Sequence, residues 1–186
     1  GKRYSYRGNS DGRNIEAGGN IGFKLGPDGF VNIAASAKDN NHAHRAIPAT
    51  GAFYYPLANG QPDPRESRDK TVFTGGLPDL RALTILYNAE LPLSPAATLY
   101  SSSTWSTREA IIGQNFRRPN STNAVLSIYP DGYAPNYTLD ENDFQIHAGI
   151  KGEAGGWSWD LSSTYGENRS KNGSTESLNA CLLYTS

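Results

Sequence analysis

The chain has 186 residues but contains no methionine and only one cysteine. A protein translated from its own start codon begins with Met, so we expect this sequence to be a piece of a longer one. A single cysteine forms neither an intramolecular disulfide nor the cysteine cluster of a zinc site. The chain also lacks an excess of positive charge, because 17 basic side chains stand against 18 acidic ones. This balance excludes the basic surface of a nucleic-acid-binding protein.

Long apolar runs are lacking as well. No stretch approaches the roughly 18 apolar residues that a membrane-spanning helix needs. The mean hydropathy of -0.59 is typical of a soluble protein. A membrane β-barrel, however, alternates apolar and polar side chains and shows no hydropathy peak. The composition therefore excludes transmembrane helices and leaves transmembrane strands open.

The lone cysteine, Cys181, lies in the last six residues, which are Cys-Leu-Leu-Tyr-Thr-Ser. This hexapeptide resembles the translation of a transposon-end adapter used to build sequencing libraries. We therefore expect residues 181–186 to be a non-native tail and the native sequence to occupy residues 1–180. The alternative is a strand end that has this sequence by coincidence.

Five segments alternate apolar and polar side chains with the period of two that is typical of β-strands. They are residues 15–25, 31–38, 82–91, 144–151 and 157–166, and in all five the charged side chains fall on one face only. Weaker patterns predict further strands over 98–107, over 1–6 and from about 177 onward. The sequence thus predicts an all-β fold built on an antiparallel sheet with one dry face.

The expected connections differ strongly in length. Residues 26–29, 92–96 and 152–156 form short turns, whereas residues 39–80 and 107–142 form long loops. Long loops are uncommon in compact soluble domains, and short turns at one end with long loops at the other are typical of outer-membrane barrels. Large aromatic residues suited to a membrane interface stand beside the short turns, although they would also cap a soluble core. These residues are Phe23, Phe30, Trp157 and Trp159.

A series of short motifs runs through residues 129–168. Residues 129–135 are Tyr-Pro-Asp-Gly-Tyr-Ala-Pro, and they are followed by Gly-Ile-Lys-Gly at 149–152, Gly-Trp-Ser-Trp-Asp-Leu-Ser at 156–162 and Tyr-Gly-Glu-Asn at 165–168. The series resembles the barrel of TonB-dependent outer-membrane receptors, in which the first motif has the form YPDGF-x-P. The resemblance covers nearly all of residues 1–180. It implies an antiparallel up-and-down meander that forms the early strands, and so an incomplete section, of a barrel of about 22 strands.

The same resemblance implies transport rather than catalysis, with no cofactor. The parent receptor would lie in the outer membrane of a Gram-negative bacterium and import a scarce nutrient such as an iron-siderophore complex. Its partners would be outer-membrane lipid and lipopolysaccharide, its own plug domain, the inner-membrane TonB complex and the small-molecule ligand. The plug and the energy-coupling box are absent from this sequence. Two alternatives stay open: a soluble all-β carbohydrate-binding or glycan-processing module, and a passive porin.

Candidate substrate contacts lie in the long loops. Pro130, Asp131 and Gly132 also form a turn signal, so a purely structural role is the alternative there. The arginine pair could meet an anionic substrate or a lipopolysaccharide phosphate, although a solvated loop tip is the commoner role for such a pair. The two histidines could share a metal, but no third ligand is near, so we expect two surface histidines and no metal site. The candidates are Tyr129, Asp131, Tyr133, Arg117, Arg118, His42 and His44.

Polar residues of the alternating segments would face the barrel lumen or the plug if the resemblance holds. They are Glu16, Asn20, Lys24, Asn88, Glu90, Lys151 and Asp160. A separate acidic run, Asp140, Glu141 and Asp143, lacks the fixed separation that glycoside cleavage requires. We expect this run to lie in a solvated loop.

Overall fold

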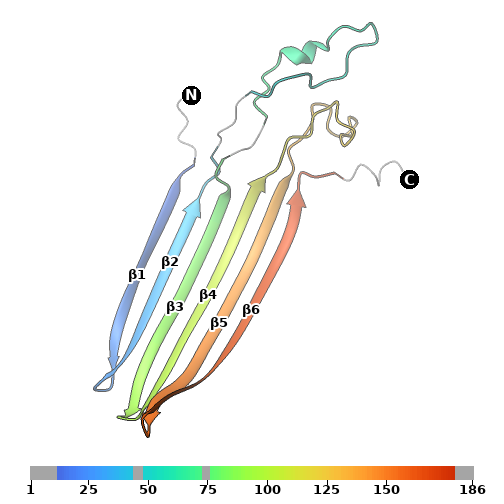
Figure 1. The fold of residues 1–186 in the computed structure, drawn as a ribbon. Coiled ribbons are helices and arrows are strands. Elements are labelled where there is room, and N and C mark those ends of the chain that lie inside the picture. The colour runs from blue at the N-terminus through green and yellow to red at the C-terminus, as the bar shows by residue number, and fades with distance from the viewer. Residues whose placement is uncertain (1–11, 44–47, 73–75, 179–186) are drawn as a thin grey trace.

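The computed structural model describes residues 12–43, 48–72 and 76–178. They form one six-stranded antiparallel sheet in which every strand pairs with its neighbours in the sequence (Figure 1). The strands are β1 (Asn14–Leu25), β2 (Gly29–Asn40), β3 (Asp79–Ser94), β4 (Ala97–Gly113), β5 (Asn136–Ala154) and β6 (Trp157–Thr175), with a single turn of 3-10 helix, η1 (Pro64–Ser67), between β2 and β3. The sheet is not closed, because β1 and β6 do not pair with each other. Within the described residues, no helix has the length and apolarity required to cross a membrane.

The predicted all-β meander is confirmed, and most strands are longer than predicted. Strand β5, for example, begins at Asn136 rather than near residue 144. The expectation that Asp140, Glu141 and Asp143 lie in a loop is therefore wrong. The reason is cross-strand pairing: Arg108 forms an ion pair with Glu141, and Asn168 donates to both Glu141 and Asp143. The predicted strand over 1–6 and the tail at 181–186 lie outside the described residues, and residues 177–178 form no strand.

The pairing register sorts side chains onto two faces, because directly paired residues point to the same side of a sheet. On the apolar face, one row crosses all six strands as Ile21, Ile33, Tyr87, Ser103, Ile146 and Tyr165. No second layer covers this face among the residues described, and Leu161 and Ile21 remain 72% and 55% exposed.

Phe30 lies on the opposite, polar face, because it pairs with Lys24 and Glu90. The aromatic residues beside the turns therefore do not all share one face.

Serines on the apolar face explain why the alternation of residues 98–107 is weak. Ser101 and Ser103 belong to this face, where a hydroxyl without a partner would be costly in an apolar setting. The Ser101 hydroxyl donates to the backbone carbonyl of His147 at 3.0 Å, and the Ser103 hydroxyl donates to that of Gln145 at 2.8 Å. Both hydroxyls are thus satisfied by β5, so this part of the face offers no unused donor.

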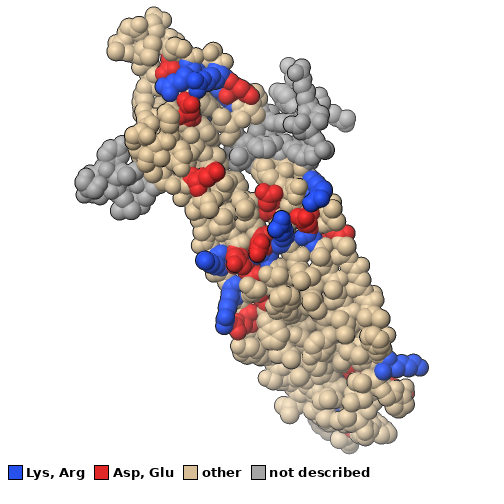
Figure 2. Space-filling model, turned by 180° about the vertical axis from the view of Figure 1, so that it is seen from behind, with Lys and Arg blue, Asp and Glu red and all other residues tan. Residues whose placement is uncertain are grey.

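A row of charged residues bounds the apolar face on the side of the long loops. Asp39, Arg81, Glu109, Asp140 and Lys171 are successive cross-strand partners from β2 to β6. Figure 2 shows charged side chains gathered in a band across the sheet, with uncharged surface between this band and the short turns. The apolar face therefore has a polar limit at one end and tight turns at the other.

Candidate functional site

The described parts of the two long loops lie at one end of the sheet and fold against each other, and we call them together the loop module. They are residues 41–43, 48–72 and 76–78 of the first loop and residues 114–135 of the second. The backbone N–H of Asn120 donates to the carbonyl of Phe53 at 3.0 Å. The rings of Phe53 and Phe116 stack with their centroids 5.8 Å apart. Phe53 is only 3% exposed and Pro119 is fully buried. The loop module therefore has a small core of its own.

Glu66 of η1 organises the first loop. The helix begins with Pro64, and the preceding residue, Asp63, caps it by accepting a hydrogen bond from the backbone N–H of Arg65. This short helix places the Glu66 carboxylate so that it accepts from the backbone N–H groups of Phe53 at 2.6 Å and Tyr54 at 2.8 Å. Lys70 donates to its other oxygen at 2.6 Å. The Lys70 hydrogen bond and the two N–H groups lower the pKa of Glu66 to about 2.

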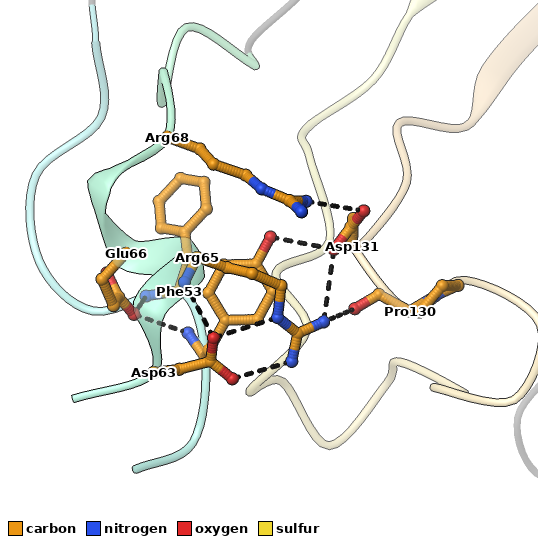
Figure 3. A network of polar contacts seen from close by, with 8 residues as sticks. Phe53, Asp63, Arg65, Glu66, Arg68, Pro130 and Asp131 are labelled. Carbon is orange, nitrogen blue, oxygen red and sulfur yellow. Dashed lines mark hydrogen bonds and ion pairs between the residues drawn. The ribbon is translucent and has the colours of Figure 1, made fainter. Parts of the chain in front are cut away.

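Asp131 joins the second loop to the first (Figure 3). It accepts a hydrogen bond from the Tyr54 hydroxyl at 3.1 Å and forms ion pairs with Arg65 at 3.3 Å and Arg68 at 3.1 Å. Arg65 also donates to the carbonyl of Pro130 at 3.2 Å. Burial acts to raise the pKa of Asp131, but the Tyr54 hydrogen bond and the two arginine charges outweigh it, so the pKa is lowered. We call this arrangement the Asp131 latch.

The rest of the YPDG segment also makes contacts within the loop module. The rings of Tyr129 and Tyr133 stack at 4.5 Å between centroids, and the Tyr133 hydroxyl donates to the carbonyl of Asn123 at 3.4 Å. Gly132 has a φ of +83°, which suits glycine. Each of the three predicted residues of this segment thus has a structural partner in the loop module, and ligand contact by them stays a prediction.

The arginine pair and the histidines are placed differently. The Arg118 guanidinium lies 4.7 Å from the Phe53 ring centroid and donates to the carbonyl of Ala52 at 3.3 Å. Arg117 pairs through its backbone with Tyr133. His42 lies two residues after the end of β2, and its backbone N–H donates to Asp79 at 2.6 Å. His44 lies outside the described residues, so the position of the two histidines relative to each other is not described.

The sequence did not single out the partners of Asp131. Tyr54, Arg65 and Arg68 all lie within residues 39–80, which the sequence predicts only as a long loop. The sequence does contain one local signal, because Asp63 followed by Pro64 is typical of the start of a helix. The polar residues 65–67 of such a helix are available for contacts with other segments. Nothing local indicates that this helix meets a turn more than 60 residues away.

All seven residues predicted to face a lumen or plug lie on the polar face of the sheet, as the register shows. Asn20 donates to Asn32 and Asn32 to Asn88, each at 3.4 Å. Most of the charged members are partnered too: Lys151 with Glu90 at 2.7 Å, and Glu16 with Lys38 at 3.7 Å. The Tyr100 hydroxyl donates to Asp160 at 2.7 Å. This face is therefore a network of polar side chains that largely bond one another.

Comparison with known proteins gives no relative on which to rest a function. No family model, curated protein or solved structure matches the chain. Function has to be inferred from the two faces of the sheet and from the loop module.

Proposed function

We propose that the chain is a section of the wall of an outer-membrane β-barrel, in a receptor of the TonB-dependent type that imports a scarce nutrient such as an iron-siderophore complex. The observation that carries this proposal is the pair of opposite faces on one open meander. The apolar face is uncovered among the described residues and ends at a charged row, while the polar face bonds largely to itself. A barrel wall needs this division, because one side meets lipid and the other meets water or a plug.

Strand length supports a membrane wall. The strands run from 12 residues in β1 to 19 in β6, whereas a tilted strand needs about 9–11 residues to cross hydrocarbon. The longer strands extend past β1 at both ends of the sheet. The rows of cross-strand partners that start at Lys24 and Asn14 reach β6 at Ser162 and Asn172, and β6 continues from there to Trp157 at the short turns and to Thr175 at the long loops. In this proposal the charged row meets lipid headgroups or lipopolysaccharide, and the loop module stands in the external medium.

The polar face would form the lumen wall. Most of its charges are paired across strands, as Lys151 is with Glu90, so a plug domain in contact with these pairs would replace water rather than break them. This suits a wall that must hold a plug and still release it when the TonB complex pulls. The motif series of residues 129–168 favours this receptor class over a passive porin, which would share only the wall.

The soluble alternative, a carbohydrate-binding or glycan-processing module, has a different requirement. A soluble sheet with one apolar face must bury that face against a second layer. The residues described supply no such layer, and Trp157 is 79% exposed. A soluble form would leave an apolar patch far larger than soluble monomers usually tolerate.

Adjacent cysteines on β6 test the proposal. Ser163 pairs with Ala148 on the apolar face, and Ser162 pairs with Gly149 on the polar face. We would introduce Ser163→Cys or Ser162→Cys into the full chain carrying Cys181→Ser, reconstitute it with outer-membrane lipid, and measure labelling by a water-soluble maleimide. We expect the cysteine at 163 to react at least tenfold more slowly than the one at 162, and both to react alike in urea.

Equal labelling at both positions in lipid would overturn the proposal, since a soluble sheet edge exposes both faces to water. Reversed protection would mean that the polar face meets lipid, which would overturn it as well. Recovery of the chain as a stable monomer without lipid or detergent would favour the soluble module.

A further inference from the structure

The loop module also contains a groove, of about 520 Å³, in which the Asp131 latch takes no part. Tyr55 of the first loop forms one wall, and residues 119–128 of the second loop form the other. Val125, Leu126 and Ile128 supply apolar surface, and four residues with hydroxyl groups supply polar surface of at least the same extent: Tyr55, Ser121, Thr122 and Ser127. This volume lies in the range of the concave sites in which proteins hold small molecules, and the mixed lining suits a ligand with both apolar and polar groups.

The groove carries no charge, and this contrasts with the loops that form it. None of its lining residues is acidic or basic. The charged side chains nearby have partners of their own: Arg65 and Arg68 bind Asp131, and Lys70 binds Glu66. Arg118 lies over the Phe53 ring and donates to a backbone carbonyl. An anionic ligand would have to break these contacts, whereas a neutral ligand would not.

The groove is held in shape by backbone hydrogen bonds. Within the second loop, the N–H of Ala124 donates to the carbonyl of Ser121 at 3.0 Å, and those of Ile128 and Tyr129 donate to Val125 at 3.0 and 2.9 Å. These consecutive turns fix the wall without a ligand. A site formed in advance loses less entropy when it binds.

Apolar side chains around the groove are exposed to solvent, which is unfavourable unless something binds there. Tyr55, Leu126 and Ile128 are 55%, 47% and 48% exposed. In the proposed function, the charged row marks the membrane boundary and the loop module lies outside the membrane. On that basis, contact with lipid does not explain why these side chains are exposed. A cluster of exposed apolar groups around a hollow is typical of a ligand site.

We propose that this groove binds a neutral small molecule that places an apolar ring or chain against Tyr55, Leu126 and Ile128 and meets the surrounding hydroxyls with a few polar groups. For the proposed receptor, this names an uncharged, amphipathic substrate class. It also moves the expected contact away from Arg118 and Asp131, which hold the loops together.

Two ligands of equal ring size test the charge preference. The full chain, labelled at the methyl groups of Ile, Leu and Val, would be titrated with neutral 2-naphthol or anionic 2-naphthoate at neutral pH and followed by NMR. We expect 2-naphthol to shift the methyl signals of Val125, Leu126 and Ile128 in a saturable way. We expect 2-naphthoate to bind at least tenfold more weakly.

Matched variants locate the binding. Leu126→Asn should weaken 2-naphthol binding at least tenfold, while Leu57→Asn should change it less than twofold, because Leu57 is exposed on the same loop module but does not line the groove. Unchanged methyl shifts of Ile33 would show that each variant keeps the sheet. Ile128→Thr gives a second, smaller change and should weaken binding in the same direction.

The proposal would be overturned if 2-naphthol gave no saturable shift at the groove, or shifted only sheet methyl groups such as those of Ile21 and Ile33. Equal effects of the two asparagine variants would overturn it as well. So would binding of 2-naphthoate as tight as that of 2-naphthol. The last result would point to the arginines instead. Because the groove methyl groups report independently of lipid protection on β6, a failed membrane test and a failed ligand test remain distinguishable.

Discussion

Asp131 shows how a single carboxylate can decide the arrangement of two long loops. Asp131 belongs to the second loop, and its carboxylate accepts a hydrogen bond from Tyr54 and forms ion pairs with Arg65 and Arg68 of the first loop. Exposed ion pairs are individually weak, so the contribution of Asp131 comes from the several partners that converge on it. The next residue, Gly132, matters because of its backbone conformation and the lack of space for a side chain. A substitution of this glycine tests that role apart from the contacts of Asp131.

We predict that Gly132→Ala loosens the loop module much more than Gly60→Ala does. Both glycines have positive φ, +83° and +79°, so either alanine costs about 1–2 kcal/mol in backbone strain. A Cβ at 132 would in addition collide with the Arg117 carbonyl and the Phe116 ring, whereas a Cβ at 60 would meet nothing. Amide exchange at Tyr133 should be at least tenfold faster in Gly132→Ala than in Gly60→Ala. Equal exchange in the two variants would contradict this account.

We also predict an acid transition in the first loop that depends on Glu66. Its pKa falls from 4.5 to about 2 in the folded protein, chiefly because of Lys70 and the two N–H groups it accepts from. A carboxylate with a lowered pKa stabilises the fold fully above its unfolded pKa, and this contribution disappears as the pH falls through the folded value. The backbone amide signals of Phe53 and Tyr54 should therefore move between about pH 4.5 and pH 2 in NMR spectra.

Glu66→Gln supplies the control for the acid transition, because its amide oxygen still accepts hydrogen bonds but carries no charge to titrate. The two amide signals should then stay constant over the same range. If they still move in Glu66→Gln, another group is responsible and Glu66 is not the acid-sensitive residue.

Among the elements, β5 shows what a strand with two different faces requires. Ile146 belongs to the apolar face, opposite Ser103 and Tyr165, and its neighbour Gln145 belongs to the polar face, opposite Thr104 and Gly166. We predict that Ile146→Arg impairs insertion into lipid and that Gln145→Arg does not. An arginine facing the middle of a bilayer costs about 2–4 kcal/mol.

The measurement is the fraction of the full chain that inserts into vesicles from urea, determined for both arginine variants side by side. The same charge is added on the same strand in each, so only the face differs. Comparable insertion of the two variants would mean that β5 does not present one face to lipid.

The strands that alternate strictly could be predicted from the sequence, and their extensions could not. Residues 144–151 have period-two alternation because one face is apolar and the other polar. Residues 136–143 are mostly polar on both faces, and they belong to β5 because Arg108 and Asn168 offer partners across the sheet. Pairing of this kind depends on other strands, so no pattern within the segment reveals it.

The loop module was beyond sequence-based prediction for a related reason. Its contacts, such as Tyr54 with Asp131, join residues that are far apart in the sequence and that belong to segments without any periodicity. The YPDG turn itself could be recognised, because Pro and Gly have local conformational preferences. Its partners are set by how β2–β3 and β4–β5 place the two loops side by side.

For the whole molecule, the decisive property is that the sheet is open. Strands β3 and β4 have a neighbour on each side, whereas β1 and β6 have only one each among the described strands. We predict that alternate backbone amides of β6 exchange rapidly with solvent in the full chain, while amides of β4 are protected throughout. Hydrogen exchange measured residue by residue gives the pattern directly.

Uniform protection along β6 would contradict this prediction and would indicate that another strand, for example from a second copy, covers the edge. Dilution distinguishes the two situations. Protection that comes from a second copy decreases as the protein concentration falls, whereas the protection of β4 does not change.

The unequal connections also suggest an order of folding. Residues 26–28, 95–96 and 155–156 close β1–β2, β3–β4 and β5–β6 as tight hairpins, whereas residues 41–78 and 114–135 separate one hairpin from the next. Closing a flexible loop costs about 0.6 kcal/mol more for each doubling of its length, and hairpins form within microseconds. The three hairpins would thus form first, and the pairing of β2 with β3 and of β4 with β5 would follow. The Asp131 latch, which spans both long connections, would close only after the hairpins have docked.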